Sequence, residues 1–232
     1  MRGLKRFFVE QFLEENMILK GELFSHLKVL RVSTGEMIVL VNGVEIGTYL
    51  VEKVFKNYLS LQLVQKRDVS NPVYKLKAYI SVLKRDYMDF VMEKMGEIGA
   101  TEVVPTITRR SIRTLPEGSV ARYKRLLING AMQSEIDFIP KLLMPADISS
   151  ILPDCEENIL FYERGGRGFH KTNSRSVSFF IGPEGGLESE EVDILLSRGF
   201  KTATPFPCVL KAETAAIIFG GMLRSEIERS IP

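Results

Sequence analysis

Two short segments near the C-terminal end of the sequence combine glycine, proline and charged residues in a pattern that suits a ligand pocket. The first, residues 182–186 (Gly-Pro-Glu-Gly-Gly), directly follows an apolar run. Glycine tolerates positive φ and lets a ligand approach the main chain closely. The second, residues 205–216, is a proline-stiffened loop that leads into Lys211 and a helical pattern. Each segment could also be purely structural, a tight turn in the first case and a helix start in the second.

The first segment is not a phosphate-binding loop of the common kinds. The sequence around residues 182–186 has no Gly-Lys-Ser/Thr and no GxGxxG pattern. Those patterns supply the main-chain N–H groups that hold a nucleoside triphosphate or a dinucleotide. Nucleoside triphosphate hydrolysis and the usual dinucleotide-binding fold are therefore disfavoured.

The sequence around these segments alternates between strand and helix patterns, which predicts an α/β domain with a largely parallel sheet. Short apolar runs predict strands at 74–80, 101–106, 158–162 and 177–181. Apolar residues at helical spacing predict helices at 86–98, 120–132, 189–198 and 212–227. We expect Gly99 to end the first helix and Ser189 to cap the third. Because ligands in such sheets bind at the carboxyl ends of the strands, the two segments could form two walls of one pocket.

The first 70 residues are rich in strand-forming residues instead. Strands are predicted at 36–40, 45–55 and 58–64, with a turn at Asn42-Gly43 and one helix at 22–30. A small barrel with one helix is the natural packing for such a segment. The polar stretch at 66–72 predicts a domain boundary, which gives domains at 1–70 and 71–232.

Composition indicates a globular protein: 45% of the 232 residues are hydrophobic and 26% are charged. No apolar run is long enough for a membrane helix and no signal peptide is evident, so we expect a cytoplasmic protein without a membrane partner. Two distant cysteines and two histidines make a poor zinc set, so no metal is expected. Basic residues cluster between positions 105 and 125 although the net charge is only +2, which fits either a phosphate backbone or a solvated charged face.

The two segments together resemble the SPOUT superfamily of methyltransferases. More closely, the chain resembles the RsmE family of small-subunit ribosomal RNA uridine-N3 methyltransferases. Residues 181–186 match its Ile-Gly-Pro-Glu-Gly-Gly motif in full, and residues 205–215 match its second motif at five positions: Pro207, Leu210, Glu213, Thr214 and Ala215. Further agreement lies at 84–99, 131–140 and two N-terminal stretches, Arg6-Phe7-Phe8 and 26–31, so the resemblance spans nearly the whole chain.

The resemblance implies a SPOUT-type α/β domain with a deep trefoil knot and a small N-terminal PUA-like β-barrel that binds RNA. It implies S-adenosylmethionine as cofactor, N3 of a uridine in 16S ribosomal RNA of the small subunit as target, and a homodimer as assembly. A catalytic role is implied for Glu184, Lys211 and Arg6. Cofactor contacts are implied for Ile181, Gly182, Pro183, Gly185, Gly186, Phe206, Val209 and Leu210. Phosphate contacts are implied for Lys28, Arg31, Arg109, Arg110 and Arg113.

This sequence departs from the family pattern near the second motif. Cys208 stands where the family has arginine, Phe206 replaces a glycine, and Lys211-Ala212 replaces Arg-Thr. The arginine expected between Ser134 and Pro140 is also absent. Lysine keeps the charge of arginine but loses its two-pronged geometry. Three alternatives therefore stay open: methylation of another RNA position such as a ribose 2′-oxygen, a non-catalytic ribosomal RNA-binding or assembly factor, and a nucleotide-binding protein without an RNA partner.

Overall fold

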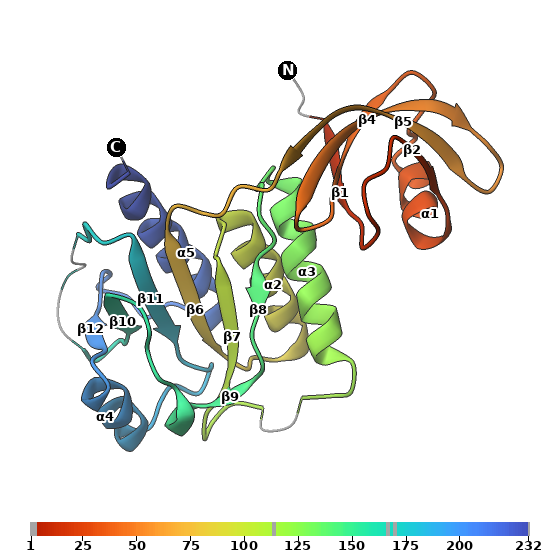
Figure 1. The fold of residues 1–232 in the computed structure, drawn as a ribbon. Helices are drawn as coiled ribbons and strands as arrows, with labels where there is room; N and C mark the ends of the chain where they lie inside the picture. The colour runs from red at the N-terminus through yellow and green to blue at the C-terminus, as the bar shows by residue number, and fades with distance from the viewer. Residues whose placement is uncertain (1–3, 113–114, 166–167, 169–170, 232) are drawn as a thin grey trace. The chain divides into compact units, whose positions relative to one another are not determined.

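Two units make up the chain in the computed structural model (Figure 1), which describes residues 4–112, 115–165, 168 and 171–231. The first unit comprises Met1–Asn71 together with Glu135–Phe138. The second comprises Pro72–Ser134 and Ile139–Pro232. Within the described residues, no helix is long and apolar enough to cross a membrane.

The first unit is a five-stranded sheet with one helix. Its elements are β1 (Lys5–Phe8), β2 (Asn16–Leu19), α1 (Gly21–Val29), β3 (Met37–Val41), β4 (Glu45–Val54) and β5 (Leu59–Asp68). The strand order is β1-β3-β4-β5-β2, with β1 parallel to β3 and the other pairs antiparallel. The predicted helix and three strands are confirmed, and β1 and β2 are additional. Over the described residues the sheet is not closed, because no pairing joins β1 to β2.

Alternating burial along these strands supplies the core of the first unit. Ile38, Leu40, Tyr49 and Val51 are fully buried and pack with Leu27 from α1. The period of two along β3 and β4 places these side chains on one face of the sheet. Their burial therefore explains why the helix packs where it does.

Within the part of the chain that the structure describes, the second unit contains a seven-stranded sheet and four α-helices. Its strands are β6 (Lys75–Ser81), β7 (Glu102–Ile107), β8 (Lys141–Leu142), β9 (Ala146–Asp147), β10 (Glu157–Phe161), β11 (Ser176–Ile181) and β12 (Lys201–Ala203). Its helices are α2 (Arg85–Ile98), α3 (Ser119–Gln133), the 3₁₀ turn η1 (Ile148–Ser150), α4 (Ser189–Ser197) and α5 (Ala212–Arg229). The order is β12-β10-β11-β6-β7-β8, with β9 also on β7, and every pair is parallel. The predicted α/β class and parallel sheet are confirmed.

Helices α2 and α5 lie behind this sheet in Figure 1, and α4 packs on side chains of its other face, as the near-continuous apolar strands require. Phe180 belongs to a buried cluster with Val192 and Leu195 of α4. Its neighbour Phe179 points to the opposite face, where a Cβ added to Gly220 of α5 would lie 3.3 Å from its ring. Helix α5 packs on α2 as well as on β6 and β11, and α2 packs on α3.

Two glycines allow α2 and α3 to pack with their backbones in contact. A Cβ added to Gly96 would lie 2.1 Å from the carbonyl oxygen of Leu127, and one added to Gly130 would lie 2.0 Å from that of Glu93. No larger residue fits at either position without moving a helix.

The sequence prediction of helix ends is partly correct. Gly99 ends α2 in the left-handed region with φ of 79°, as expected. The N-cap of α4 is Glu188 and not Ser189. The Glu188 side chain accepts a hydrogen bond from the Glu191 N–H group, and the Glu191 side chain accepts one from the Glu188 N–H group, which together form a capping box. The Glu188 carboxylate thus takes the place of the expected Ser189 hydroxyl. The bond from the Glu188 N–H group to the Glu191 carboxylate, 3.0 Å long, stabilises the helix start at Glu188.

Candidate active site

The two glycine- and proline-containing segments line one pocket of about 440 Å³ in the second unit. The first follows β11, and the second connects β12 to α5. The start of α2 and the residues after β10 supply the remaining walls. The lining residues are Lys84, Tyr87, Phe161, Tyr162, Glu163, Ile181–Leu187, Val209–Glu213 and Ala215. Because β6, β10, β11 and β12 are parallel, their carboxyl ends meet at this edge of the sheet.

The first segment forms a tight turn that only glycine accommodates. Gly186 has φ of 74° and donates its N–H group to the carbonyl oxygen of Pro183 over 2.9 Å. A Cβ on Gly182 would lie 3.2 Å from the side chain of Leu187. The turn therefore presents main chain to the pocket in place of side chains, as expected for a loop that a ligand approaches closely.

Glu184 connects this turn to the start of α2. Its carboxylate accepts a hydrogen bond from the Lys84 N–H group over 3.2 Å. Lys84 is the N-cap of α2, and the Lys84 side chain makes no capping hydrogen bond. A carboxylate at a helix N-terminus is favoured both by the free N–H groups and by the helix dipole. The exposed Glu184 therefore has a structural task besides any role toward a ligand.

The second segment brings Val209, Leu210 and Lys211 to the pocket, whereas Phe206 is not one of its lining residues. The Phe206 ring stacks on Phe219 at 5.9 Å between centroids. Phe219 in turn stacks on Phe161 at 3.9 Å, and Phe161 does line the pocket. Phe206 therefore belongs to an aromatic row behind the wall formed by Phe161.

Five pocket residues lie far from the two segments in the sequence and were not predicted: Lys84, Tyr87, Phe161, Tyr162 and Glu163. Four others, Leu187, Ala212, Glu213 and Ala215, lie in or next to the segments but had no predicted contact. Phe161, Tyr162 and Glu163 could have been predicted, because the strand expected at 158–162 ends at the same edge of the sheet as the strand before the glycine turn. Lys84 and Tyr87 fell within the stretch that resembles the family, but no role was assigned to them.

Arg109 and Arg110, predicted to contact phosphates, lie against the acidic first turn of α4. Arg109 Nη1 pairs with Glu188 Oε2 at 2.5 Å and with Glu190 Oε2 at 2.7 Å. The hydrogen bond from Arg109 lowers the pKa of the Glu188 carboxyl group. Arg110 Nε lies 3.6 Å from Glu188 Oε1. The third predicted arginine, Arg113, lies outside the described residues.

The remaining predicted residues lie in the first unit. Lys28 is exposed on α1, and Arg31 is exposed just after it with φ of 53°. Arg6 of β1 is largely buried and pairs with Asp137 at 2.6 Å. Asp137 also pairs with Arg67 at 2.6 Å. Burial raises the pKa of the Asp137 carboxyl group, but the bonds from Arg6 and Arg67 outweigh it, so the pKa lies below its usual value.

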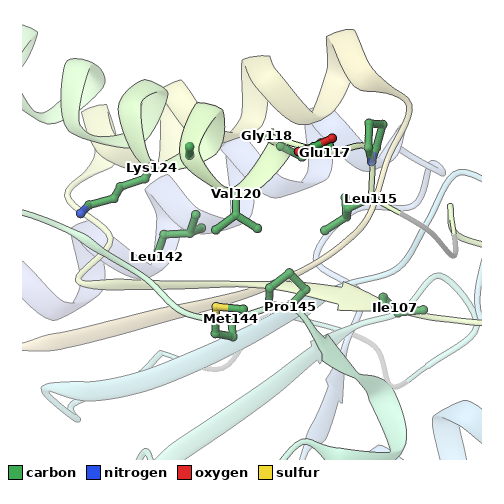
Figure 2. A pocket seen from close by; sticks show the side chains of 12 residues that line it. Ile107, Leu115, Glu117, Gly118, Val120, Lys124, Leu142, Met144 and Pro145 are labelled. Atoms are coloured by element: carbon green, nitrogen blue, oxygen red, sulfur yellow. The ribbon is translucent and has the colours of Figure 1, made fainter.

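A larger hollow of about 810 Å³ lies beside the N-terminal end of α3 (Figure 2). Figure 2 shows Val120 and Leu142 above Met144 and Pro145, while Lys124 extends away from them. Its lining is mainly aliphatic and brings no set of polar groups together. The smaller pocket is therefore the candidate site. Among the residues that the structure describes, no group of three or more His, Cys, Asp or Glu side chains is placed to hold a metal.

Known proteins resemble this chain over nearly its whole length. A Ribosomal RNA small subunit methyltransferase E from Aquifex aeolicus (strain VF5) is 27% identical, and the match covers 91% of this chain and 95% of that protein. The protein of the same name from Bacillus subtilis (strain 168) is 25% identical, with coverage of 92% and 93%. The crystal structure of a Ribosomal RNA small subunit methyltransferase E from Neisseria gonorrhoeae, bound to S-adenosyl methionine, has a TM-score of 0.83 at 24% identity. That match covers 96% of this chain and 98% of the other.

A family model described as an RNA methyltransferase domain matches residues 69–224. This range contains every residue that lines the candidate pocket. The family resemblance predicted from the two segments is thereby confirmed, and the chain belongs to the RNA methyltransferase family.

Proposed function

We propose that the chain transfers a methyl group from S-adenosylmethionine to N3 of a uridine in 16S ribosomal RNA of the small subunit. The observation that carries the proposal is the joint pocket: both segments that resemble the family motifs line it. The names of the similar proteins, and the S-adenosyl methionine bound to one of them, support the cofactor and the substrate.

The residues at the pocket fit such a cofactor. A volume of about 440 Å³ lies within the range of small-molecule sites, and apolar walls with a few polar groups are typical of them. We propose that the main chain at Ile181, Gly182, Pro183, Gly185 and Gly186 binds the cofactor together with the side chains of Val209 and Leu210. When bound, S-adenosylmethionine supplies an electrophilic methyl group on its sulfonium sulfur.

The reaction requires the chain to hold uracil in line with that methyl group. N3 of uracil is weakly acidic: it forms the new bond to carbon as it gives up its proton, while the sulfur keeps the electron pair of the broken bond. Charge that develops on the uracil oxygens needs a cation nearby. We propose that Lys211 supplies it, since Lys211 lines the pocket at the start of α5. Glu184 orients the target base while it holds the start of α2.

The other expectations from the resemblance are also proposals. Lys28 and Arg31 would contact RNA phosphates, and Arg6 a uracil oxygen. The first 70 residues would act as a PUA-like RNA-binding domain, with an open sheet in place of the expected closed barrel, and residues 71–232 as a SPOUT domain. A trefoil knot in this domain is proposed from the resemblance alone.

A homodimer is supported by apolar side chains exposed on two helices that pack together. Phe90 of α2 is 47% exposed and Ile218 of α5 is 36% exposed. A second copy of the chain could cover these side chains. A ribosomal substrate would place the protein in the cytoplasm, where ribosomal subunits are found.

Calorimetric titration with S-adenosylmethionine tests the pocket assignment. Val209 is 77% exposed and lines the pocket, so Val209→Asp adds a charge there without disturbing the core. Val44→Asp, at a residue 69% exposed in the first unit, is the matched control. A charge buried by the cofactor without a partner should weaken binding at least about tenfold. Wild-type affinity in Val209→Asp would show that the cofactor binds elsewhere.

A further inference from the structure

The glycine turn of the pocket is held from outside by the segment that follows β7. Arg110 Nη1 donates a hydrogen bond to the carbonyl oxygen of Gly185 over 3.0 Å. A Cβ added to Gly185 would lie 3.2 Å from the Cβ atom of Arg110 and 3.4 Å from its Cδ atom. The aliphatic part of Arg110 therefore lies against the turn, and its guanidinium group fixes the orientation of the peptide group that joins Gly185 to Gly186.

A buried carboxylate joins the same segment to α4. Glu191 is only 1% exposed, and its Oε1 atom accepts the Arg109 N–H group over 2.8 Å. Its Oε2 atom accepts the Glu188 N–H group over 3.0 Å. Both oxygens are thus used to satisfy main-chain donors, one on each side. A buried carboxylate with both oxygens bonded in this way fixes the geometry of the two segments it joins.

The positive charges of this segment are already balanced. Arg109 contacts Glu188 and Glu190, and Arg110 contacts Glu188. An RNA phosphate would have to compete with these carboxylates for the guanidinium groups. The local geometry therefore favours a role within the protein over a role as a phosphate site.

We propose that Arg110, supported by Glu191, is a positioning residue that sets the shape of the cofactor turn at residues 182–186. The inference rests on the proposed function of the pocket. It assigns Arg110 to cofactor affinity through the Gly185 carbonyl and not to the phosphate backbone. Glu191 acts one step further away, since it holds the main chain of Arg109 beside the turn.

Two equilibrium measurements on the full chain separate these roles. S-adenosylmethionine affinity is measured by calorimetric titration, and affinity for purified 16S ribosomal RNA is measured by filter binding across a series of salt concentrations. The variants are Arg110→Gln, Arg110→Lys and Glu191→Gln. Arg229→Gln is the matched control, because Arg229 pairs with Glu226 at 2.6 Å on α5 and does not line the pocket. Circular dichroism melting of the unliganded proteins establishes that each variant is folded at the temperature of titration.

We expect Arg110→Gln and Glu191→Gln to raise the Kd for S-adenosylmethionine about tenfold, the equivalent of one lost hydrogen bond to a charged group. Arg110→Lys should recover most of that loss, and Arg229→Gln should bind as wild type. The RNA Kd and its salt dependence should stay unchanged in all four variants. Unchanged cofactor affinity in a folded Arg110→Gln, with a salt slope lower by about one, would make Arg110 a phosphate contact and overturn the inference.

A lower melting temperature with unchanged cofactor affinity would also overturn it, because it would show a purely structural role. Failure of the wild-type protein to bind S-adenosylmethionine would instead refute the proposed function itself. The two failures are therefore distinguishable in one series of titrations.

Discussion

Glu184 provides the sharpest test of how the glycine turn works, because its carboxylate has a visible structural partner. The Glu184→Gln variant keeps an oxygen that can accept the Lys84 N–H group, whereas Glu184→Ala removes the acceptor. If the main task of Glu184 is to hold the start of α2 and orient the target base, the glutamine variant should retain a methyl transfer rate within about threefold of wild type. If Glu184 removes the uracil proton, glutamine should be nearly as damaging as alanine.

The structure sets the size of each effect. One hydrogen bond contributes about 0.5–1.5 kcal/mol, and a negative charge at a helix N-terminus adds about 0.3–1 kcal/mol. Glu184 is exposed, so both values belong at the low end. We expect Glu184→Ala to lower the free energy of unfolding by about 1 kcal/mol and Glu184→Gln by less than about 0.5 kcal/mol. Asp86→Asn, in the first turn of the same helix, measures the charge contribution alone.

Urea unfolding followed by circular dichroism gives the stabilities, and single-turnover methyl transfer gives the rate of the chemical step. Loss of general base catalysis typically costs a factor of about 10² to 10⁴. A loss of that size in Glu184→Gln, with wild-type stability, would show that holding and orienting are not the main tasks of Glu184 and would identify it as the proton acceptor.

Three further predictions concern stability, each measured by circular dichroism. Gly130→Ala should cost about 2–3 kcal/mol, because the new methyl group meets the Glu93 carbonyl. Burial raises the pKa of Tyr49 to about 12, above the unfolded value near 10, so stability is full below pH 10 and falls between pH 10 and 12. Tyr49→Phe should remove that alkaline loss. The pKa of Asp137 is lowered, despite burial, by the bonds from Arg6 and Arg67, so its contribution is present above the unfolded pKa and lost as pH falls below about 4. Asp137→Asn should reduce this loss of stability at acid pH. An unchanged loss would show that Asp137 does not cause it.

Elements with a strong local pattern were predictable from the sequence. Helix α2 repeats Met88, Val91, Met92 and Met95 on one face, and all four are fully buried. The apolar strand β11 and the glycine turn after it were predictable for the same reason: the pattern and the turn chemistry act locally. The edge at which the two loops meet also followed, because parallel strands share a carboxyl edge.

Features that depend on distant partners were not predictable. Strands β8 and β9 have two residues each and exist only because β7 offers them an edge. The charge pattern around Arg109 and Arg110 suggested an RNA surface, yet their partners Glu188 and Glu190 lie about 80 residues away in the sequence. A local count of charges cannot reveal pairing over such a separation. The buried position of Glu191 was hidden for the same reason, since a helix start rich in acids is usually exposed.

Methyl transfer to small ribosomal subunits that lack native methylation tests the central claim most directly. The protein is incubated with methyl-labelled S-adenosylmethionine and these subunits, and the modified nucleoside is identified by mass spectrometry. We expect label on N3 of a uracil in 16S ribosomal RNA. Label on another atom, such as a ribose 2′-oxygen, would contradict the substrate assignment. Absence of label in a preparation that binds the cofactor would contradict the catalytic assignment and favour an RNA-binding assembly factor.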